Sequence, residues 1–397
     1  MSHPIVVARL SIHSLAIPMR RAFSHAAARR ICAEPIVVRI ELSDHTLGHG
    51  ETHPRTYVTG ESHQDVIETI REVFVPILVE LRPANFGEVI EAAANLPVED
   101  KNGRVIAAAR AAVELALLDA YGRAMRRSLA SLAGYVEERW LGSVGSRSSV
   151  RFGVVISGME PGRIGRFVRK VRLGMIRHFK LKVGDVDDQP RLEATVRALR
   201  RGLDRRSVTL VVDANGAWNL GQATEKLRAW EGLPITCVEQ PLQKDAGPDW
   251  AALAAATRLP LMADESLVTA EDAEALIAQD GASWFNIRIS KNGGLIPAMR
   301  LAAMARRHNV SYQLGCMVGE TSVLSAAGRW FLQMVPGVRF AEGSYGRFLL
   351  RDGVVRRPLR FSLGGRWQPV GGSGLGIEVE AERLERLAVI PAVEIPF

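Results

Sequence analysis

The chain is poor in cysteine and in aromatic residues, and it contains no long hydrophobic run. Its 397 residues include three cysteines, Cys32, Cys237 and Cys316, which lie far apart and form neither a CxxC pair nor an even set for disulfides. We therefore expect a reducing, cytoplasmic setting. Arg, His and Pro interrupt the short apolar stretches at the N-terminus, and no run of about eighteen apolar residues follows, so we expect neither a signal peptide nor a membrane span.

Long runs of one charge are also missing. Lys and Arg number 51 and Asp and Glu 43, which gives a net charge of +8, and the basic residues occur in short scattered clusters without interleaved aromatic residues. This pattern argues against nucleic-acid binding and suits the attraction of a small anion. A hydrophobic content of 47% over this length predicts two domains, or one large barrel with an extra domain.

The first part of the chain has the pattern of an α+β domain, which we place at residues 1–140. Apolar and polar residues alternate over residues 6–17 and 35–42, as in strands, and residues 48–60 are rich in turn formers. Residues 104–125 then follow a helical pattern that is apolar over most of its circumference, which predicts a buried helix. Strands followed by helices, without alternation, are typical of an α+β fold.

From about residue 147 strands and helices alternate, and polar residues recur at the predicted strand ends every 24 to 31 residues. These residues are Lys182, Asp213, Glu239, Asp264, Arg288, Gln313 and Glu342. The interval is about the length of one βα unit, so the pattern favours a parallel, TIM-like (β/α)8-type barrel over residues 141–358, with an open doubly wound sheet as the alternative. The tail, 359–397, lacks this rhythm, and we expect it to return to the first domain.

Three carboxylates end three consecutive apolar strands: Asp213 in LVVDAN, Glu239 in CVEQPL and Asp264 in LMADES. Buried carboxylates that converge would repel one another unless a cation compensates them. Oxygen ligands without a convergent His or Cys favour a hard divalent ion, so we expect Mg²⁺, with Mn²⁺ also possible. The alternative is that each acid caps a loop or pairs with an arginine.

Lys180 and Lys182 lie two residues apart in HFKLKVG, so their side chains project to the same side of a strand. Close to each other and to a metal, their ammonium pKa values should be lowered, which makes a lysine usable as a base. The alternative is an ordinary solvated strand face.

Together these motifs resemble the enolase superfamily, and within it the muconate lactonizing enzyme subgroup. The resemblance rests on K-x-K, VDAN, VEQP, ADES and the strand NIRISKNGG, behind a G-x-GE motif at residues 48–51 and an ELALLDAYG helix. It implies an α+β capping domain on a (β/α)7β barrel, a homo-oligomer, and Mg²⁺ held by the three acids. It also implies a small carboxylate substrate, whose α-proton Lys182 abstracts to give an enediolate.

The sequence departs from the subgroup at the position of its second catalytic lysine, where Arg288 stands. Strand alternation points Arg288 inward and places Lys291 on the opposite phase or in the turn. An arginine keeps its proton, so we expect one-base chemistry, as in a muconate cycloisomerase or a syn elimination. Another kind of enzyme remains as an alternative: an N-acylamino-acid racemase or epimerase in which Lys291 is the second base, or an o-succinylbenzoate synthase-like enzyme. An alternative of another class is a metal-binding barrel with weakened or no catalysis.

Substrate contacts are expected from two loops of the capping domain, residues 23–30 and 48–60. The candidate residues are His25, Arg29, Arg30, His53 and Tyr57 from these loops, with Asn215 and Glu320 from the barrel.

Overall fold

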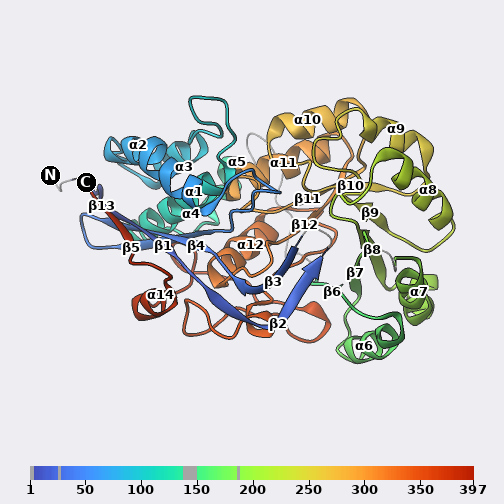
Figure 1. Cartoon of the computed structure of the whole chain (residues 1–397). Coiled ribbons are helices and arrows are strands. Elements are labelled where there is room, and N and C mark those ends of the chain that lie inside the picture. Colours follow the sequence, from blue (N-terminus) through green and yellow to red (C-terminus); the bar gives the residue numbers. More distant parts are fainter. Residues whose placement is uncertain (1–3, 26–27, 137–149, 186–187) are drawn as a thin grey trace.

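The alternating segments near the N-terminus form an antiparallel sheet with the strand order β13-β1-β4-β5, and β2 and β3 form a separate hairpin. The computed structural model describes residues 4–25, 28–136, 150–185 and 188–397. The strand bounds are β1 (Val7–Ser14), β2 (Ile17–His25), β3 (Ala28–Ala33), β4 (Ile36–Leu42), β5 (Leu47–Thr52) and β13 (Val393–Pro396). Because β13 pairs with β1, the C-terminal strand lies on this sheet beside the N-terminal one (Figure 1). The turn-rich segment 48–60 is a loop only after residue 52, since its first residues belong to β5.

A layer of helices packs on this sheet and completes the capping domain (Figure 1). The elements are α1 (His63–Thr69), the π-helical turn η1 (Ile70–Phe74), α2 (Val75–Val79), α3 (Phe86–Ala94), α4 (Ala107–Ala124) and α5 (Ser131–Val136). The predicted buried helix is α4, whose residues are buried on all sides from Ala107 to Gly122. Gly48 and Gly50 of β5 allow its close approach, because a Cβ at Gly50 would lie 1.9 Å from the carbonyl oxygen of Ala112.

The second domain is a parallel barrel, as predicted. Seven strands lie in the order in which they follow in the chain: β6 (Val154–Ile156), β7 (His178–Lys182), β8 (Thr209–Asp213), β9 (Cys237–Glu239), β10 (Leu261–Ala263), β11 (Trp284–Ile287) and β12 (Ser311–Leu314). The segment 340–342 closes the ring: Leu314 N donates to Phe340 O at 3.2 Å, and Gly153 N donates to Ala341 O at 2.9 Å. Because β12 and the start of β6 are joined in this way, the alternative of an open sheet is wrong.

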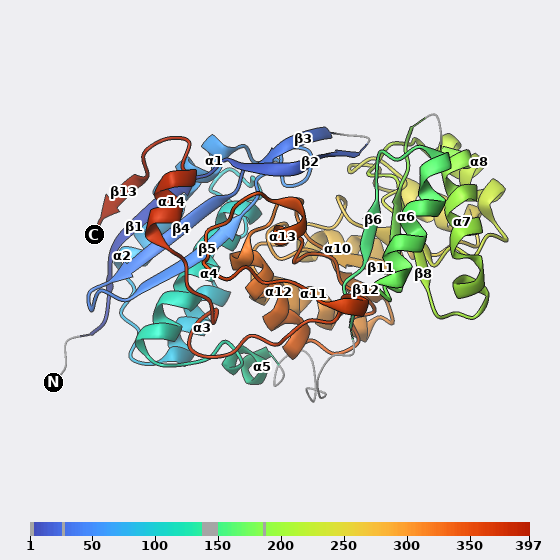
Figure 2. The same ribbon diagram turned by 90° about the horizontal axis from the view of Figure 1, so that it is seen from below.

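Helices follow the barrel strands and form its outer layer (Figure 2). They are α6 (Pro161–Leu173), α7 (Asp188–Asp204), α8 (Leu220–Trp230), α9 (Asp249–Ala256), α10 (Ala270–Ala278), α11 (Leu295–Arg307) and α12 (Ser322–Met334). After the eighth segment come α13 (Gly346–Leu349), the 3-10 turn η3 (Leu363–Gly365) and α14 (Ala381–Leu387). Within the described ranges, no helix is both long and apolar enough to cross a membrane.

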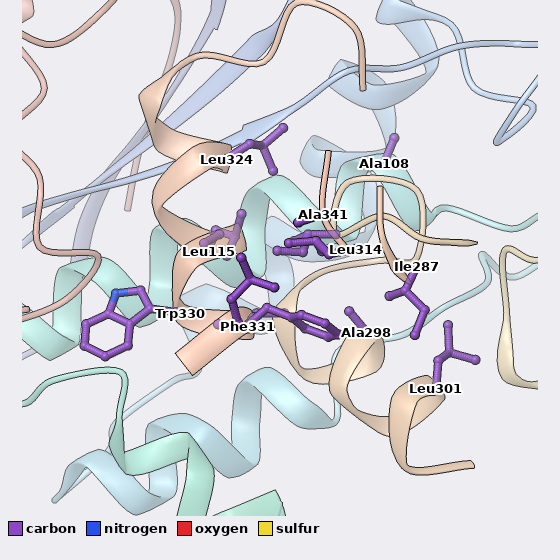
Figure 3. Close-up of a cluster of buried hydrophobic side chains, with 14 of the residues drawn as sticks. Ala108, Leu115, Ile287, Ala298, Leu301, Leu314, Leu324, Trp330, Phe331 and Ala341 are labelled. Atoms are coloured by element: carbon purple, nitrogen blue, oxygen red, sulfur yellow. The ribbon is translucent and has the colours of Figure 1, made fainter. Parts of the chain in front are cut away.

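An apolar cluster joins the two domains (Figure 3). Ala108 and Leu115 of α4 lie in one cluster with Leu324 and Phe331 of α12. Acids of the capping domain also bind the ends of barrel helices, where backbone N–H groups have no partner within the helix. Glu51 accepts from the backbone N of Thr321 and Leu324 at the start of α12.

Glu114 of α4 does the same at the start of α11, where it accepts from the backbone N of Leu295 and Ile296. Glu51 of the G-x-GE motif and Glu114 of the ELALLDAYG helix therefore orient the cap on the barrel rather than reach the reaction centre.

Candidate active site

The three predicted metal acids lie together at the carboxyl end of the barrel strands. Asp213 ends β8, Glu239 ends β9, and Asp264 directly follows β10. Asp213 and Glu239 are register partners in the parallel ladder, and each of the three residues is 0% exposed. Parallel strands bring residues at their carboxyl ends to one edge, which is why acids 26 and 25 residues apart in the sequence lie close together.

Each of these acids contacts at least one cation. Lys180 Nζ lies 2.6 Å from Glu239 Oε2 and 2.7 Å from Glu342 Oε1. Lys182 Nζ donates to Asp213 Oδ2 at 2.5 Å, and the guanidinium of Arg288 pairs with Asp264 Oδ2. The cost of burying the carboxylates is thus offset by ion pairs with cations from the neighbouring strands.

The cations and acids set one another's pKa values. Burial favours the neutral form of Lys180, but the charges of Glu239, Glu342 and Asp213 raise its pKa well above the usual value. The expectation of a lowered pKa is therefore wrong for Lys180 in this arrangement, because carboxylates surround it. Burial and the charge of Asp213 raise the pKa of Glu239 to about 7. Asp213 itself has a lowered pKa, since Lys182 and Lys180 outweigh its burial.

The donor set fits a hard divalent ion. Asp213, Glu239 and Asp264 offer carboxylate oxygens alone, and Asp264 Oδ2 accepts no hydrogen bond of good geometry although Arg288 lies against it. Among the described residues, no group of three His, Cys, Asp or Glu side chains is already arranged around a common metal position. Instead, the amino groups of Lys180 and Lys182 and the guanidinium of Arg288 pair with the three carboxylates, and a bound divalent ion would add its positive charge to theirs.

Arg288 and Lys291, three residues apart, face different environments. Arg288 directly follows β11 and lines a large cavity above the acids. Lys291 is 0% exposed and folds back beneath the site, where its Nζ donates to Asp264 O at 2.6 Å, to Asp264 Oδ1 at 3.1 Å and to Asn286 O at 2.9 Å. Burial and the nearby charge of Arg288 lower the pKa of Lys291 well below its usual value.

The cavity has a volume of about 870 Å³ and lies between the barrel mouth and the capping domain. Lys180, Lys182 and Arg288 line it from the barrel strands and the turns that follow them. Lys182 Nζ also donates to Asn215 Oδ1 at 2.7 Å, so Asp213 and Asn215 together hold this amino group at the cavity. The arrangement can therefore present a lysine and an arginine to one bound molecule.

Two family models match the chain. The model described as "Enolase C-terminal domain-like" matches residues 163–383, more than half of the chain, and the "Mandelate racemase / muconate lactonizing enzyme, N-terminal domain" matches residues 9–134. The chain belongs to the mandelate racemase/muconate lactonizing enzyme family of the enolase superfamily. The chain is therefore an enzyme of the isomerase or racemase type, and the alternative of a barrel without catalysis is wrong.

Relatives of this family member fall into two groups. The N-succinyl-L-Arg/Lys racemase of Bacillus cereus is 26% identical over 396 residues, which cover 96% of this chain and 98% of that protein. Its solved structure has a TM-score of 0.84 at 24% identity and covers 98% of this chain and 100% of that one. The muconate cycloisomerase 1-2 of Acinetobacter lwoffii is 27% identical over 393 residues, which cover 97% of this chain and 96% of that protein.

A solved dipeptide epimerase from Cytophaga hutchinsonii, complexed with Mg and the dipeptide D-Ala-L-Val, has a TM-score of 0.82 at 20% identity and covers 98% of this chain and 100% of that one. This family member is thus an enzyme that abstracts the proton α to a carboxylate. Its relatives at about this identity include both cycloisomerases and racemases or epimerases, so likeness alone leaves the reaction open.

The predicted substrate contacts of this family member lie in different places. Tyr57, Asn215 and Arg30 line the cavity. His53 does not: it is 0% exposed and its Nε2 lies 3.0 Å from Glu51 Oε1, while burial lowers its pKa.

Glu320 also lies outside the lining of the large cavity, because its side chain turns back to accept from Met317 N at 2.6 Å. Burial raises the pKa of this carboxyl well above its usual value. His25 and Arg29 belong to β2 and β3, but their side chains fall outside the described residues.

Sequence reasoning missed three groups that line the cavity. Glu265 follows Asp264 directly and accepts from Asn215 Nδ2 at 3.0 Å. Glu342 is the last polar residue of the strand-end series, and its position in the sequence alone indicates no role. Arg55 stands between two candidate residues of the same loop, His53 and Tyr57, and no pattern in the sequence distinguishes the direction of its side chain from theirs.

Proposed function

We propose that this enzyme uses one base on one face of the substrate: Lys182 exchanges the proton at the carbon α to a substrate carboxylate in a muconate cycloisomerase-like reaction, or removes it and passes it to the leaving group in a syn elimination. The observation that carries the proposal is the pair of cations at the cavity. Lys182 can accept a proton when it is neutral, whereas Arg288 keeps its proton at any working pH. Lys291 is 0% exposed and is absent from the cavity lining.

The surroundings of Lys182 support its role as the base. The residue is 9% exposed and its side chain lines the cavity, and Asp213 and Asn215 hold its amino group. Lys180 is 3% exposed and is enclosed by Glu239 and Glu342, so it suits orientation and charge balance better than proton transfer. Asp213, Glu239 and Asp264 would hold Mg²⁺, which when bound supplies positive charge to the substrate carboxylate as the enediolate forms.

Arg288 would hold negative charge on the opposite side. Its Nη2 pairs with Asp264, and its Nη1 lies 3.7 Å from Met317 Sδ. An anionic group of the substrate can therefore accept hydrogen bonds from the N–H groups of this guanidinium. Without a second proton acceptor, the α-carbon exchanges its proton on one face only.

A two-base racemase or epimerase is the second candidate, because the names of several relatives state that activity. In this chain it would require Lys291 to reach the substrate. Lys291 would first have to leave three hydrogen bonds, two of which satisfy the carbonyls of Asp264 and Asn286.

The test is α-proton exchange in D2O with Mg²⁺, over a set of chiral N-acylamino acids and unsaturated dicarboxylates. For wild type we expect deuterium uptake at the α-carbon with retention of configuration, or a cycloisomerised product from a dicarboxylate. Lys182→Ala should reduce exchange by at least about a hundredfold, the usual contribution of a general base. Arg288→Lys places an amino group on the second side, and we expect it to introduce measurable inversion.

Lys101→Ala, at an exposed position of the capping domain, is the matched control and should exchange as wild type does. Inversion by wild type at a rate comparable to exchange would overturn the one-base proposal. Exchange that survives Lys182→Ala would remove Lys182 as the base.

A further inference from the structure

Gln240 lies in the turn beside the acids that we assign to the metal. It follows Glu239 directly at the end of β9, and it is 0% exposed. Its amide oxygen accepts from Asp264 N at 2.9 Å and from Ser266 N at 3.1 Å. A single side chain therefore connects the backbone next to Glu239 with the backbone of Asp264 itself.

The amide nitrogen of Gln240 holds the same two turns together from the other side. Nε2 donates to Leu242 O at 2.7 Å and to Ser266 Oγ at 2.8 Å, and Ser266 Oγ donates to Lys244 O at 2.7 Å. A glutamine amide has two N–H donors and two acceptor positions, and here each of them has a partner. The side chain therefore cannot rotate without losing several hydrogen bonds at once.

The backbone of Gln240 extends these connections to the neighbouring strands. Gln240 O accepts at 2.8 Å from the backbone N of Gly216, which lies in the turn after Asp213. Gln240 N donates at 2.8 Å to the backbone O of Met262, which lies in β10 shortly before Asp264. The turn at Gln240 thus joins the carboxyl ends of the three strands that carry the acids.

The backbone conformation indicates that the side chain itself has a function in this turn. Gln240 has φ +38°, in the left-handed region. Glycine adopts this region without cost, whereas a residue with a Cβ is strained there, and such strain is concentrated at functional sites. A glycine would relieve the strain at this position but would lack the amide that binds Asp264 N and Ser266 N.

The separation of the acid backbones matters for the choice of metal ion. Carboxylate side chains can rotate towards an ion, but rotation does not change the distance between the backbones that carry them. Mg²⁺ requires oxygen ligands at about 2.0 to 2.1 Å in nearly octahedral geometry, whereas Ca²⁺ accepts about 2.3 to 2.6 Å in flexible arrangements. A site whose backbones are held firmly can therefore favour the smaller ion, and a loosened site loses this advantage.

We propose that Gln240 is a positioning residue that holds Glu239 and Asp264 at the separation that suits Mg²⁺ better than Ca²⁺. It does not line the cavity, and it acts through the backbone of Asp264 and Ser266 rather than by contact with the substrate. The inference rests on the assignment of the acids to the metal, which belongs to the function proposed above.

The test measures the affinities of the full-length enzyme for Mg²⁺ and for Ca²⁺ by calorimetry, after chelation and without substrate. Gln240→Met keeps most of the side-chain volume and removes all four hydrogen bonds of the amide. We expect it to weaken Mg²⁺ binding by about tenfold to a hundredfold, as for other groups that orient metal ligands, and Ca²⁺ binding by less than about threefold. The ratio of the two affinities is the decisive readout, because a general loss of stability does not change it.

Two further variants keep the test decisive where Gln240→Met does not fold. Gln240→Gly suits the left-handed backbone and lacks the amide, so it should lower the Mg²⁺/Ca²⁺ ratio as Gln240→Met does. Ser266→Ala removes one acceptor of the amide nitrogen and should lower the ratio by about threefold, the effect of one ordinary hydrogen bond. Thermal unfolding verifies that each variant is folded.

Gln222→Ala is the matched control. Gln222 is an exposed glutamine at the start of α8, where its side chain accepts from Asn219 N at 3.1 Å as part of a capping box. Its replacement should lower the free energy of unfolding and leave the Mg²⁺/Ca²⁺ ratio unchanged.

An unchanged ratio in both Gln240→Met and Gln240→Gly would overturn this inference. So would a ratio that Gln222→Ala lowers as much as Gln240→Met does, or the absence of any metal binding by wild type. Exchange of the α-proton in D2O is measured on the same samples. A ratio that depends on Gln240, without any α-exchange, would support this inference and count against the proposed reaction, so the two failures are distinguishable.

Discussion

Replacing Lys291 with methionine separates a supporting lysine from a catalytic one. Met has nearly the same length and no charge, so Lys291→Met removes the three hydrogen bonds of the amino group while filling most of its space. The carbonyls of Asp264 and Asn286 lose a donor in a region where Lys291 is 0% exposed, and Asp264 keeps only the Arg288 side of its ion pairs.

The magnitude follows from these partners. Removing one member of a buried ion pair typically costs about 3 to 5 kcal/mol. Two effects reduce this cost here: Arg288 still pairs with Asp264, and the ammonium of Lys291 no longer has to be buried next to that arginine, a cost that its lowered pKa reflects. We therefore expect the lower end, a loss of about 3 kcal/mol in the free energy of unfolding.

Urea unfolding followed by circular dichroism measures this loss, and α-exchange in D2O below the unfolding transition measures the chemistry. We expect Lys291→Met to exchange more slowly, because Asp264 is less well held, but with the stereochemical course of wild type. Two results would refute the reasoning: a stability change below about 1 kcal/mol, the scale of a single ordinary hydrogen bond, or wild-type inversion that Lys291→Met abolishes while exchange on the first face continues.

Three further predictions concern packing, pH and the metal. Gly50→Ala should lower the free energy of unfolding by at least about 3 kcal/mol, because its Cβ would lie 1.9 Å from a backbone oxygen of α4. Gly165→Ala on α6, where a Cβ would meet nothing within 4 Å, should raise it by about 0.5 to 1 kcal/mol, and thermal unfolding compares the two variants. Burial and the charge of Arg39 lower the pKa of His13 to about 4, so the unfolded chain binds more protons than the folded one between pH 6.5 and 4. The free energy of unfolding, measured in urea, should therefore fall by up to about 1.4 kcal/mol per pH unit as the pH drops from 6.5 towards 4. His13→Gln should reduce this slope. After chelation, added Mg²⁺ should restore exchange in wild type but not in Asp213→Asn; full exchange by the chelated enzyme would contradict the metal assignment.

The fold could be predicted because its signals are local and repeated. Strand ends every 24 to 31 residues reflect one βα unit each. The helix predicted at residues 104–125 is apolar over most of its circumference, and this composition by itself indicates that it is buried. The position of β5 was harder, because the two glycines of residues 47–52 suggest a turn. Their reason is the close approach of α4, a contact more than 60 residues away in sequence.

The acids of the site could be predicted for the same reason, whereas the pKa of Lys180 could not. Two lysines on one strand side suggest mutual repulsion, but the sequence does not reveal that Glu239 and Glu342 enclose one of them. Arg55 was missed because loop residues have no periodicity: His53 turns into the interior while Arg55 and Tyr57 line the cavity. Such directions depend on anchors such as Lys244, on another domain.

The charge balance of the barrel mouth supports the proposed function. Its acids are Asp213, Glu239, Asp264, Glu265 and Glu342, and its cations are Lys180, Lys182, Arg288 and Lys291. With each group in its usual charge state, the mouth carries one excess negative charge. A divalent ion and one substrate carboxylate would together bring it to neutrality.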